Sequence, residues 1–99
     1  MYARCYKFTF TEGTFDEALD FFDESALPMI EALDGHLGVQ SVKINDTESM
    51  MITFYRDKGA AANASDAATP LFEKFSQWLS AAPEVVGEGE VIRSLNLGY

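Results

Sequence analysis

Large hydrophobic side chains recur at alternate positions in the first ten residues of the chain. They are Tyr2, Tyr6, Phe8 and Phe10. A spacing of two places side chains on one face of a β-strand, and aromatic and threonine residues favour strands. The pattern therefore predicts a strand over 2–11 with its aromatic side chains on a single face.

Three later segments are also rich in β-branched and aromatic residues, and each predicts a strand. These segments are 39–44, 50–55 and 85–97. The turn-forming residues 45–48 separate the first two of them, so those two strands are expected to form a hairpin. Gly87 and Gly89 predict a bend or bulge in the last strand.

Between the first two predicted strands, hydrophobic residues recur at every third or fourth position, as they do on one face of a helix. They are Phe15, Ala18, Leu19, Phe22, Ala26, Met29, Ile30 and Leu33. Thr14 and Glu17 have the spacing of a capping box, which predicts that the helix starts at this point. Pro28 predicts a kink, and Gly35 predicts the end of the helix.

A second helix is predicted over 71–82, where large hydrophobic residues again follow a helical spacing. The preceding segment, 57–70, is rich in alanine and has high helix propensity but few large side chains to bury. Its small side chains, over Ala60–Ala68, leave two interpretations open. The segment either packs closely on the sheet or leaves a cavity above it.

The predicted order of elements is β-α-β-β-α-β. This order is typical of the α+β ferredoxin-like arrangement, in which a four-stranded antiparallel sheet carries two helices on one face. The strand 50–55 has hydrophobic residues on both faces, whereas a face exposed to water should be polar. We therefore expect the open face of the sheet to pack on a second copy of the chain in a homodimer.

Composition narrows the function classes. The 99 residues predict a single domain over 1–99, and the net charge of -9 opposes binding to nucleic acid or to an anionic membrane surface. No apolar run approaches the roughly 20 residues of a membrane helix. Cys5 is the only cysteine and His36 the only histidine, which predicts a cytoplasmic setting and no metal site.

Four stretches together carry a resemblance to a known family. They are MYARCYKFTFTEGTFDEAL, LPMIEALDGHLGVQSVKI, MMITFYRD and SAAPEVVGEGEVI. In these stretches the chain resembles the dimeric α+β barrel superfamily and, within it, the antibiotic-biosynthesis-monooxygenase-like domains. The resemblance implies a dimer formed through the sheets, with a pocket between the sheet and helices of each subunit.

The resemblance also implies two kinds of chemistry, because the family includes cofactor-free oxygenases and haem-degrading enzymes. The haem-degrading members use an asparagine, a tryptophan and a histidine. The matching positions in this chain are Tyr6, Ala64, and Phe75 or Ser76. Because none of the three side chains occurs at its matching position, neither haem degradation nor a cofactor is expected.

Tyr6 is the predicted catalytic residue, because its hydroxyl could donate a hydrogen bond to a quinone or phenolate oxygen. The alternative is a core aromatic residue with no chemical role. The expected pocket lining consists of Phe8, Phe22, His36, Tyr55 and Trp78. His36 could also be a proton acceptor, although a turn residue is the favoured interpretation.

Two functions remain open at this stage. The first is a cofactor-independent monooxygenase that acts on a hydrophobic, aromatic or quinone-like small molecule, since such ligands suit an apolar pocket. The second is a non-catalytic dimeric module that binds a ligand or serves a stress-related role. Either Arg4 or Arg93 could bind an anionic ligand, although pairing with Glu90 or a neighbour across a strand is the favoured interpretation.

Overall fold

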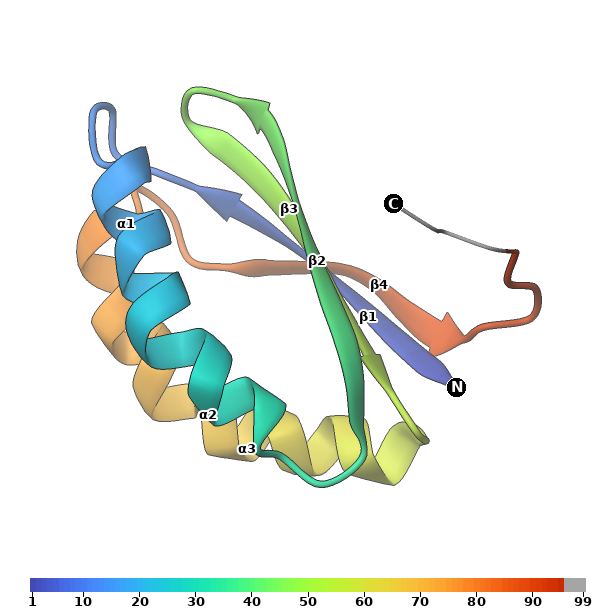
Figure 1. The fold of residues 1–99 in the computed structure, drawn as a ribbon. Coiled ribbons are helices and arrows are strands. Elements are labelled where there is room, and N and C mark those ends of the chain that lie inside the picture. The colour runs from blue at the N-terminus through green and yellow to red at the C-terminus, as the bar shows by residue number, and fades with distance from the viewer. Residues whose placement is uncertain (96–99) are drawn as a thin grey trace.

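The computed structural model describes residues 1–95, which form one antiparallel sheet with helices on one face (Figure 1). The strands are β1 (Tyr2–Thr9), β2 (His36–Asn45), β3 (Glu48–Tyr55) and β4 (Glu84–Glu90). Their order in the sheet is β2-β3-β1-β4. The predicted α+β ferredoxin-like fold, βαββαβ, is therefore confirmed.

Burial alternates strictly along the two central strands. In β1 the buried positions include Tyr2 and Phe8, and in β3 they include Ser49 and Tyr55. The register pairs Tyr2 with Tyr55 and Phe8 with Ser49. The spacing of two in the sequence therefore identifies the side chains that face the helices.

The first helical segment runs from α1 (Phe15–Phe21) through the π-helical turn η1 (Phe22–Ala26) into α2 (Leu27–Glu31). Pro28 lies in the first turn of α2, where its missing N–H is tolerated. The predicted kink at Pro28 thus takes the form of a change in helix type just before it. The predicted capping box is wrong: the Thr14 hydroxyl lies 2.7 Å from the Thr11 carbonyl oxygen and 3.0 Å from that of Trp78.

The second helical segment is longer than predicted. It comprises α3 (Lys58–Phe75) and a 3-10 turn, η2 (Ser76–Trp78). Asp57 caps α3, since its carboxylate accepts a hydrogen bond of 2.8 Å from the Ala60 amide. The alanine-rich segment is therefore helical, as its propensity indicated, but Pro70 lies inside α3 and does not separate it from the helix predicted over 71–82.

Several strand ends differ from the predicted ones. β1 ends at Thr9, and Phe10 forms only an isolated bridge to Leu79. β2 starts at His36, so His36 is a strand residue rather than a loop residue. β4 ends at Glu90, before the predicted end at Leu97, which lies outside the described residues. A register shift between β1 and β4 lies near Gly87, as the glycines predicted.

The core divides into two clusters along the sheet. The larger one holds the aromatic side chains Phe8, Phe10, Phe75 and Trp78, together with Tyr6, Ala18 and Met51. The smaller one lies under the first turns of α3 and consists of Tyr2, Tyr55, Ala60, Ala61 and Ala64. The alanines therefore let α3 pack closely on the sheet at this end, which leaves the space above the other end to larger side chains.

Candidate functional site

A cavity of about 200 Å³ lies between the sheet and the two helical segments, on the side of the larger core cluster. Most of its wall is aromatic. The phenylalanines that line it are Phe8, Phe10, Phe15, Phe21, Phe22, Phe72 and Phe75. Leu19, Ile30, Met51, Ala68 and Leu71 complete its apolar wall, together with Ala26. Such a wall suits a flat hydrophobic molecule.

The aromatic wall is held in place by contacts among its own members. The rings of Phe8 and Phe10 meet that of Phe75 edge-on, with centroids 5.4 and 5.7 Å apart. Phe21 also contacts Phe75, at 6.3 Å. Edge-to-face pairs of this kind stabilise their geometry, so the cavity is formed without a ligand.

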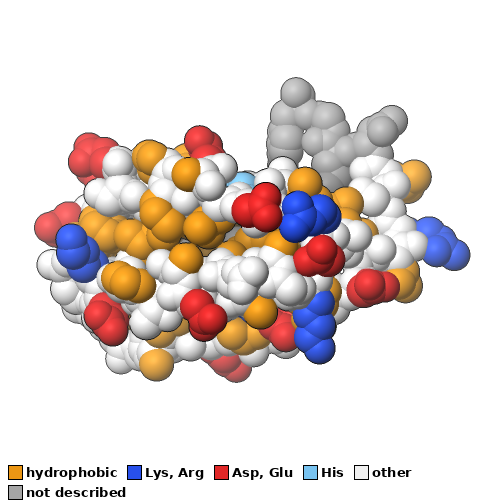
Figure 2. Space-filling view, turned by 90° about the horizontal axis from the view of Figure 1, so that it is seen from below, with side chains coloured by type: hydrophobic (Ala, Val, Ile, Leu, Met, Phe, Trp, Pro, Cys, Tyr) orange, Lys and Arg blue, Asp and Glu red, His pale blue; other side chains and the backbone are white. Residues whose placement is uncertain are grey.

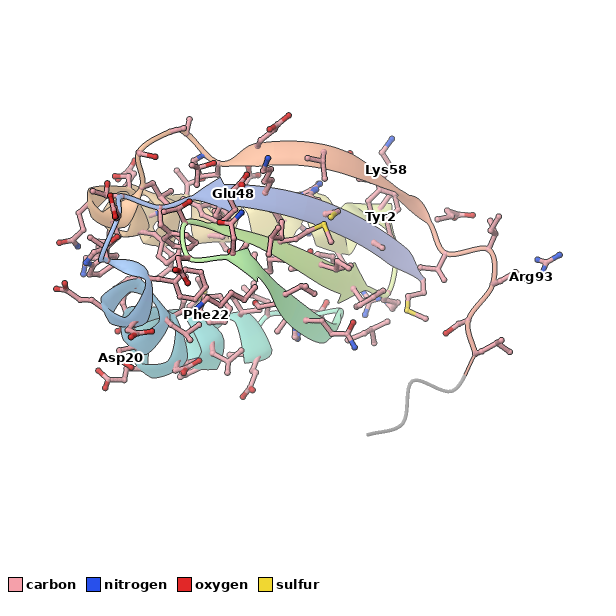
Figure 3. All side chains as sticks on the ribbon, turned by 90° about the horizontal axis from the view of Figure 1, so that it is seen from above. Tyr2, Asp20, Phe22, Glu48, Lys58 and Arg93 are labelled. Atoms are coloured by element: carbon pink, nitrogen blue, oxygen red, sulfur yellow. The ribbon has the colours of Figure 1, made fainter. Side chains whose placement is uncertain are left out.

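The surface and the side-chain views agree with this description. Figure 2 shows a band of hydrophobic side chains on the side of the molecule where α2 and α3 lie, with acidic and basic groups around it. In Figure 3, Phe22 points from the first helical segment toward the sheet, whereas Asp20 points away from it. The acidic positions of α1 thus lie on the solvent side of the cavity wall.

Among the described lining residues, polar side chains enter the cavity only from the sheet. They belong to Ser41 and Lys43 on β2 and to Ser49 on β3. Ser49 is buried, with 8% of its surface exposed, whereas Ser41 and Lys43 are exposed. Lys43 lies 3.6 Å from Asp46 and 4.8 Å from the centre of the Phe15 ring. The cavity therefore has one hydroxyl from a buried residue, Ser49. At its edge lies one positive charge, the Lys43 ammonium group, which is paired with Asp46.

Two of the predicted site residues, Phe8 and Phe22, line this cavity. Tyr6 lies behind the wall, where its ring stacks on Phe8 at 6.0 Å and touches Phe72 at 5.5 Å. Trp78 supports the wall from outside through Phe21, at 5.1 Å.

His36 and Tyr55 lie at the other end of the sheet. They pair across β2 and β3, and their rings are 5.9 Å apart in an edge-on contact. The His36 Nε2 atom is buried, without a hydrogen-bond partner among the described residues. Burial raises the pKa of the Tyr55 hydroxyl. The structure thus separates these two side chains from Phe8 and Phe22.

A buried polar cluster fills the space beside Tyr6. The Arg4 guanidinium contacts Glu88 at 2.5 Å, the Tyr6 hydroxyl at 3.5 Å, the Ala61 carbonyl oxygen at 3.3 Å and the Ser65 hydroxyl. Hydrogen bonds from Arg4 and from Tyr2 hold the pKa of the Glu88 carboxyl below its usual range. Arg4 therefore pairs across the strand as expected, with Glu88 as its partner.

The sequence interpretation did not single out Ser41, Lys43 or Ser49. Alternation could have placed Ser49 on the face of Met51 and Tyr55, because the three lie at alternate positions of β3. Whether Ser49 faces a cavity depends on how the helices pack on the sheet, and this cannot be inferred from the alternation of residues along a strand.

No cluster of three or more histidine, cysteine, aspartate or glutamate side chains that could hold a metal ion occurs within residues 1–95. In the same part of the chain, no helix is long and apolar enough to cross a membrane.

Comparison with solved structures reveals the fold relatives. The monooxygenase from the gene ActVA-Orf6 of Streptomyces coelicolor, solved with the ligand nanaomycin D, matches at a TM-score of 0.80 and 14% identity, covering 98% of this chain and 92% of that one. SnoaB, a cofactor-independent oxygenase from Streptomyces nogalater, matches at 0.78 and 15% identity, with 95% of both chains covered.

A dimeric ferredoxin-like protein from an uncultured marine organism matches at a TM-score of 0.74 and 16% identity, covering 97% of this chain and 99% of that one. The chain therefore shares the ferredoxin-like α+β fold of these proteins. This confirms the predicted resemblance at the level of fold, which the antibiotic biosynthesis monooxygenases share. Proteins of unknown function share it too. No protein-family model matches the chain, and no curated protein matches its sequence.

Proposed function

We propose that this α+β barrel protein is a cofactor-independent oxygenase for a hydrophobic, aromatic or quinone-like small molecule that binds in the phenylalanine-lined cavity. The observation that carries the proposal is the composition of that cavity, which is apolar except on the wall formed by the sheet. The fold likeness to a cofactor-independent oxygenase and to a monooxygenase solved with nanaomycin D supports the same chemistry.

The proposed reaction needs no redox group from the protein. When one O₂ oxidises a phenol to a quinone, one oxygen atom enters the ring and the other leaves as water, so the substrate supplies all four electrons. The protein's contribution is then to orient the ring, to exclude water and to place a polar group near the reacting oxygen. The phenylalanine wall serves the first two of these roles.

Tyr6 remains the predicted hydrogen-bond donor to the reacting oxygen. Its ring lies between Phe8 and Phe72, and its hydroxyl lies 3.5 Å from Arg4. A substrate would reach this hydroxyl only if Phe72 turned aside, and Phe72 is half-buried rather than fully enclosed. Tyr6 therefore acts in this scheme on a substrate that displaces Phe72.

The homodimer is part of the same proposal. The open face of the sheet carries hydrophobic side chains, which include Met50, Ile52 and Phe54 on β3 and Val42, the partner of Met50, on β2. Val42 is 44% exposed in the single chain, and the β3 side chains are half-buried. A second copy packed on this face would bury them. The fold relative described as dimeric supports this arrangement.

The alternative function is a dimeric module that binds a ligand, or serves a stress-related role, without turnover. The observation that favours it is the scarcity of acid–base groups in the cavity. Lys43 is the only titratable side chain among the described lining residues, and it contacts Asp46.

Oxygen consumption with a panel of dihydroxynaphthalenes tests the proposal, with mass spectrometry of the product. The native protein should consume O₂ and yield quinones, and Tyr6→Phe should lower the rate at least tenfold. Tyr2→Phe is the matched control, because it removes another buried tyrosine hydroxyl, bonded to Glu88 and not to the cavity. Binding without oxygen consumption would support the non-catalytic module instead.

A further inference from the structure

We propose that the Ser49 hydroxyl binds the oxygen atom of the cavity ligand and so selects aromatic molecules that carry a hydroxyl or carbonyl group. This inference rests on the proposed function only in placing an aromatic ligand in the cavity. It concerns binding and not turnover. It assigns recognition to a serine on β3, separate from the predicted reaction partner Tyr6.

The position of Ser49 in the sheet directs its side chain into the cavity. Ser49 pairs with Phe8 on β1 and with Lys43 on β2, and all three residues line the cavity. Cross-strand partners in an antiparallel sheet point to the same face. A ring that stacks against Phe8 would therefore lie beside the Ser49 hydroxyl.

Ser49 differs from the other buried polar residues in its hydrogen bonding. The buried polar side chains are those of Arg4, Ser49 and Thr53. Arg4 bonds to Glu88 and Ala61, and the Thr53 hydroxyl donates to the Arg4 carbonyl oxygen. Within residues 1–95 the Ser49 side chain has no such partner, and its oxygen is not enclosed, because His36 Nε2 is the only enclosed side-chain nitrogen or oxygen without a partner there. The Ser49 hydroxyl is therefore open to the cavity. A ligand that displaces water from the cavity would leave this hydroxyl unpaired unless a ligand oxygen bonds to it.

The two other polar lining residues are less suited to this role. Ser41 is exposed, so water satisfies its hydroxyl at little cost. Lys43 is also exposed, and its charge is shared between Asp46 and the Phe15 ring. Discrimination between ligands is largest where the polar group would otherwise be buried and unpaired. Among the three, this holds for Ser49.

The chemistry of a serine hydroxyl sets the ligand class. It can donate to a carbonyl oxygen and accept from a phenolic O–H, so it accommodates both a quinone and a phenol. It gives no such contact to a methyl group of the same size. The cavity should therefore prefer an oxygenated aromatic ring to the matching hydrocarbon.

Calorimetric titration with 2-naphthol and 2-methylnaphthalene tests the inference, without any measurement of turnover. The native protein should bind 2-naphthol more tightly. Ser49→Ala should weaken 2-naphthol binding about tenfold, the effect of one lost hydrogen bond. It should change binding of 2-methylnaphthalene less than twofold. Ser41→Ala removes the other serine hydroxyl of the same wall, and it should weaken 2-naphthol binding less than Ser49→Ala does.

Three results of the titrations would overturn the inference. Equal binding of 2-naphthol by Ser49→Ala and the native protein would remove Ser49 from recognition, as would a larger effect of Ser41→Ala. Absence of binding by the native protein would show that the cavity does not accept such rings. Urea unfolding of each variant, together with the hydrocarbon titration, separates a lost contact from a lost fold. A Ser49 effect without oxygen consumption would instead contradict only the proposed oxygenase activity.

Discussion

Gly35 lies so close to Ala60 that a β-carbon on Gly35 would come within 2.6 Å of the Ala60 Cβ atom. Gly35 also has a φ of +80°, which side-chain-bearing residues rarely adopt. The contact joins the turn before β2 to the first turns of α3. It explains why small residues occur on both sides of this junction.

We therefore expect Gly35→Ala to destabilise the fold by about 2–4 kcal/mol, from backbone strain and overpacking together. Urea unfolding measures this change. Gly13→Ala is the control, because Gly13 has a similar φ of +82° but no atoms within 4 Å of the added carbon. If Gly35→Ala and Gly13→Ala lowered the free energy of unfolding equally, the contact with Ala60 would contribute nothing to the destabilisation.

The Arg4–Glu88 pair should make stability depend on pH. Because the folded-state pKa of Glu88 is lowered, its ion pair stabilises the protein fully above the unfolded pKa, about 4.3. That contribution is lost as the pH falls through the lower folded pKa. Urea unfolding at a series of acidic pH values measures the free energy of unfolding. As the pH falls, this free energy should decrease less for Glu88→Gln than for the native protein. Glu90→Gln, on the same strand, should keep the pH dependence of the native protein. If Glu90→Gln and Glu88→Gln changed this dependence equally, the Arg4–Glu88 pair would not be its cause.

Ala68 lies on α3 and lines the cavity. Ala68→Leu should fill part of that volume and weaken 2-naphthol binding at least tenfold, because the added side chain and the ring would occupy the same space. Calorimetry measures the affinity. Ala67→Leu adds the same group at an exposed position one residue away, and it should bind like the native protein. Unchanged affinity in Ala68→Leu would place the ligand elsewhere.

Ile52 lies in the middle of the open face, between its strand partners Cys5 and Gln40. Ile52→Glu should convert a homodimer into monomers at micromolar concentration, because a carboxylate would be buried between two sheets. Light scattering reports the mass. Ile92→Glu changes a side chain that is 79% exposed and lies outside the sheet, and it should leave the mass unchanged. A native protein of monomer mass would refute the dimer itself.

Much of the fold follows from the alternation and helical spacing of hydrophobic residues. Tyr2 and Phe8 share the helix-covered face of β1 because side chains in a strand repeat every two residues. The continuity of α3 was harder to predict than its helical character, because the helix passes through Pro70, a residue that usually ends one. Helix propensity and helix-ending residues do not predict the packing against the sheet that keeps such a helix continuous.

The candidate site was only partly predictable for a related reason. Phe8 and Phe22 belong to the cavity, and their spacing already placed them on the inner faces of a strand and a helix. Tyr6 shares the face of Phe8, yet Phe72 covers its ring. The contact between Phe72 and Tyr6 depends on how α3 packs across the sheet, and this packing brings together segments that are distant in the sequence. The same packing leaves Ser49 facing the cavity.

The π-helical turn Phe22–Ala26 sets the rotational phase of everything that follows it in the first helical segment. A π turn holds one residue more than an α turn. If the same five residues were regular α-helix instead, the extra residue would rotate α2 by about 100° about its axis relative to α1. Ile30, which now lines the cavity, would turn away from it. The shape of the binding space therefore depends on a single inserted residue in the helix and not only on the side chains that line it.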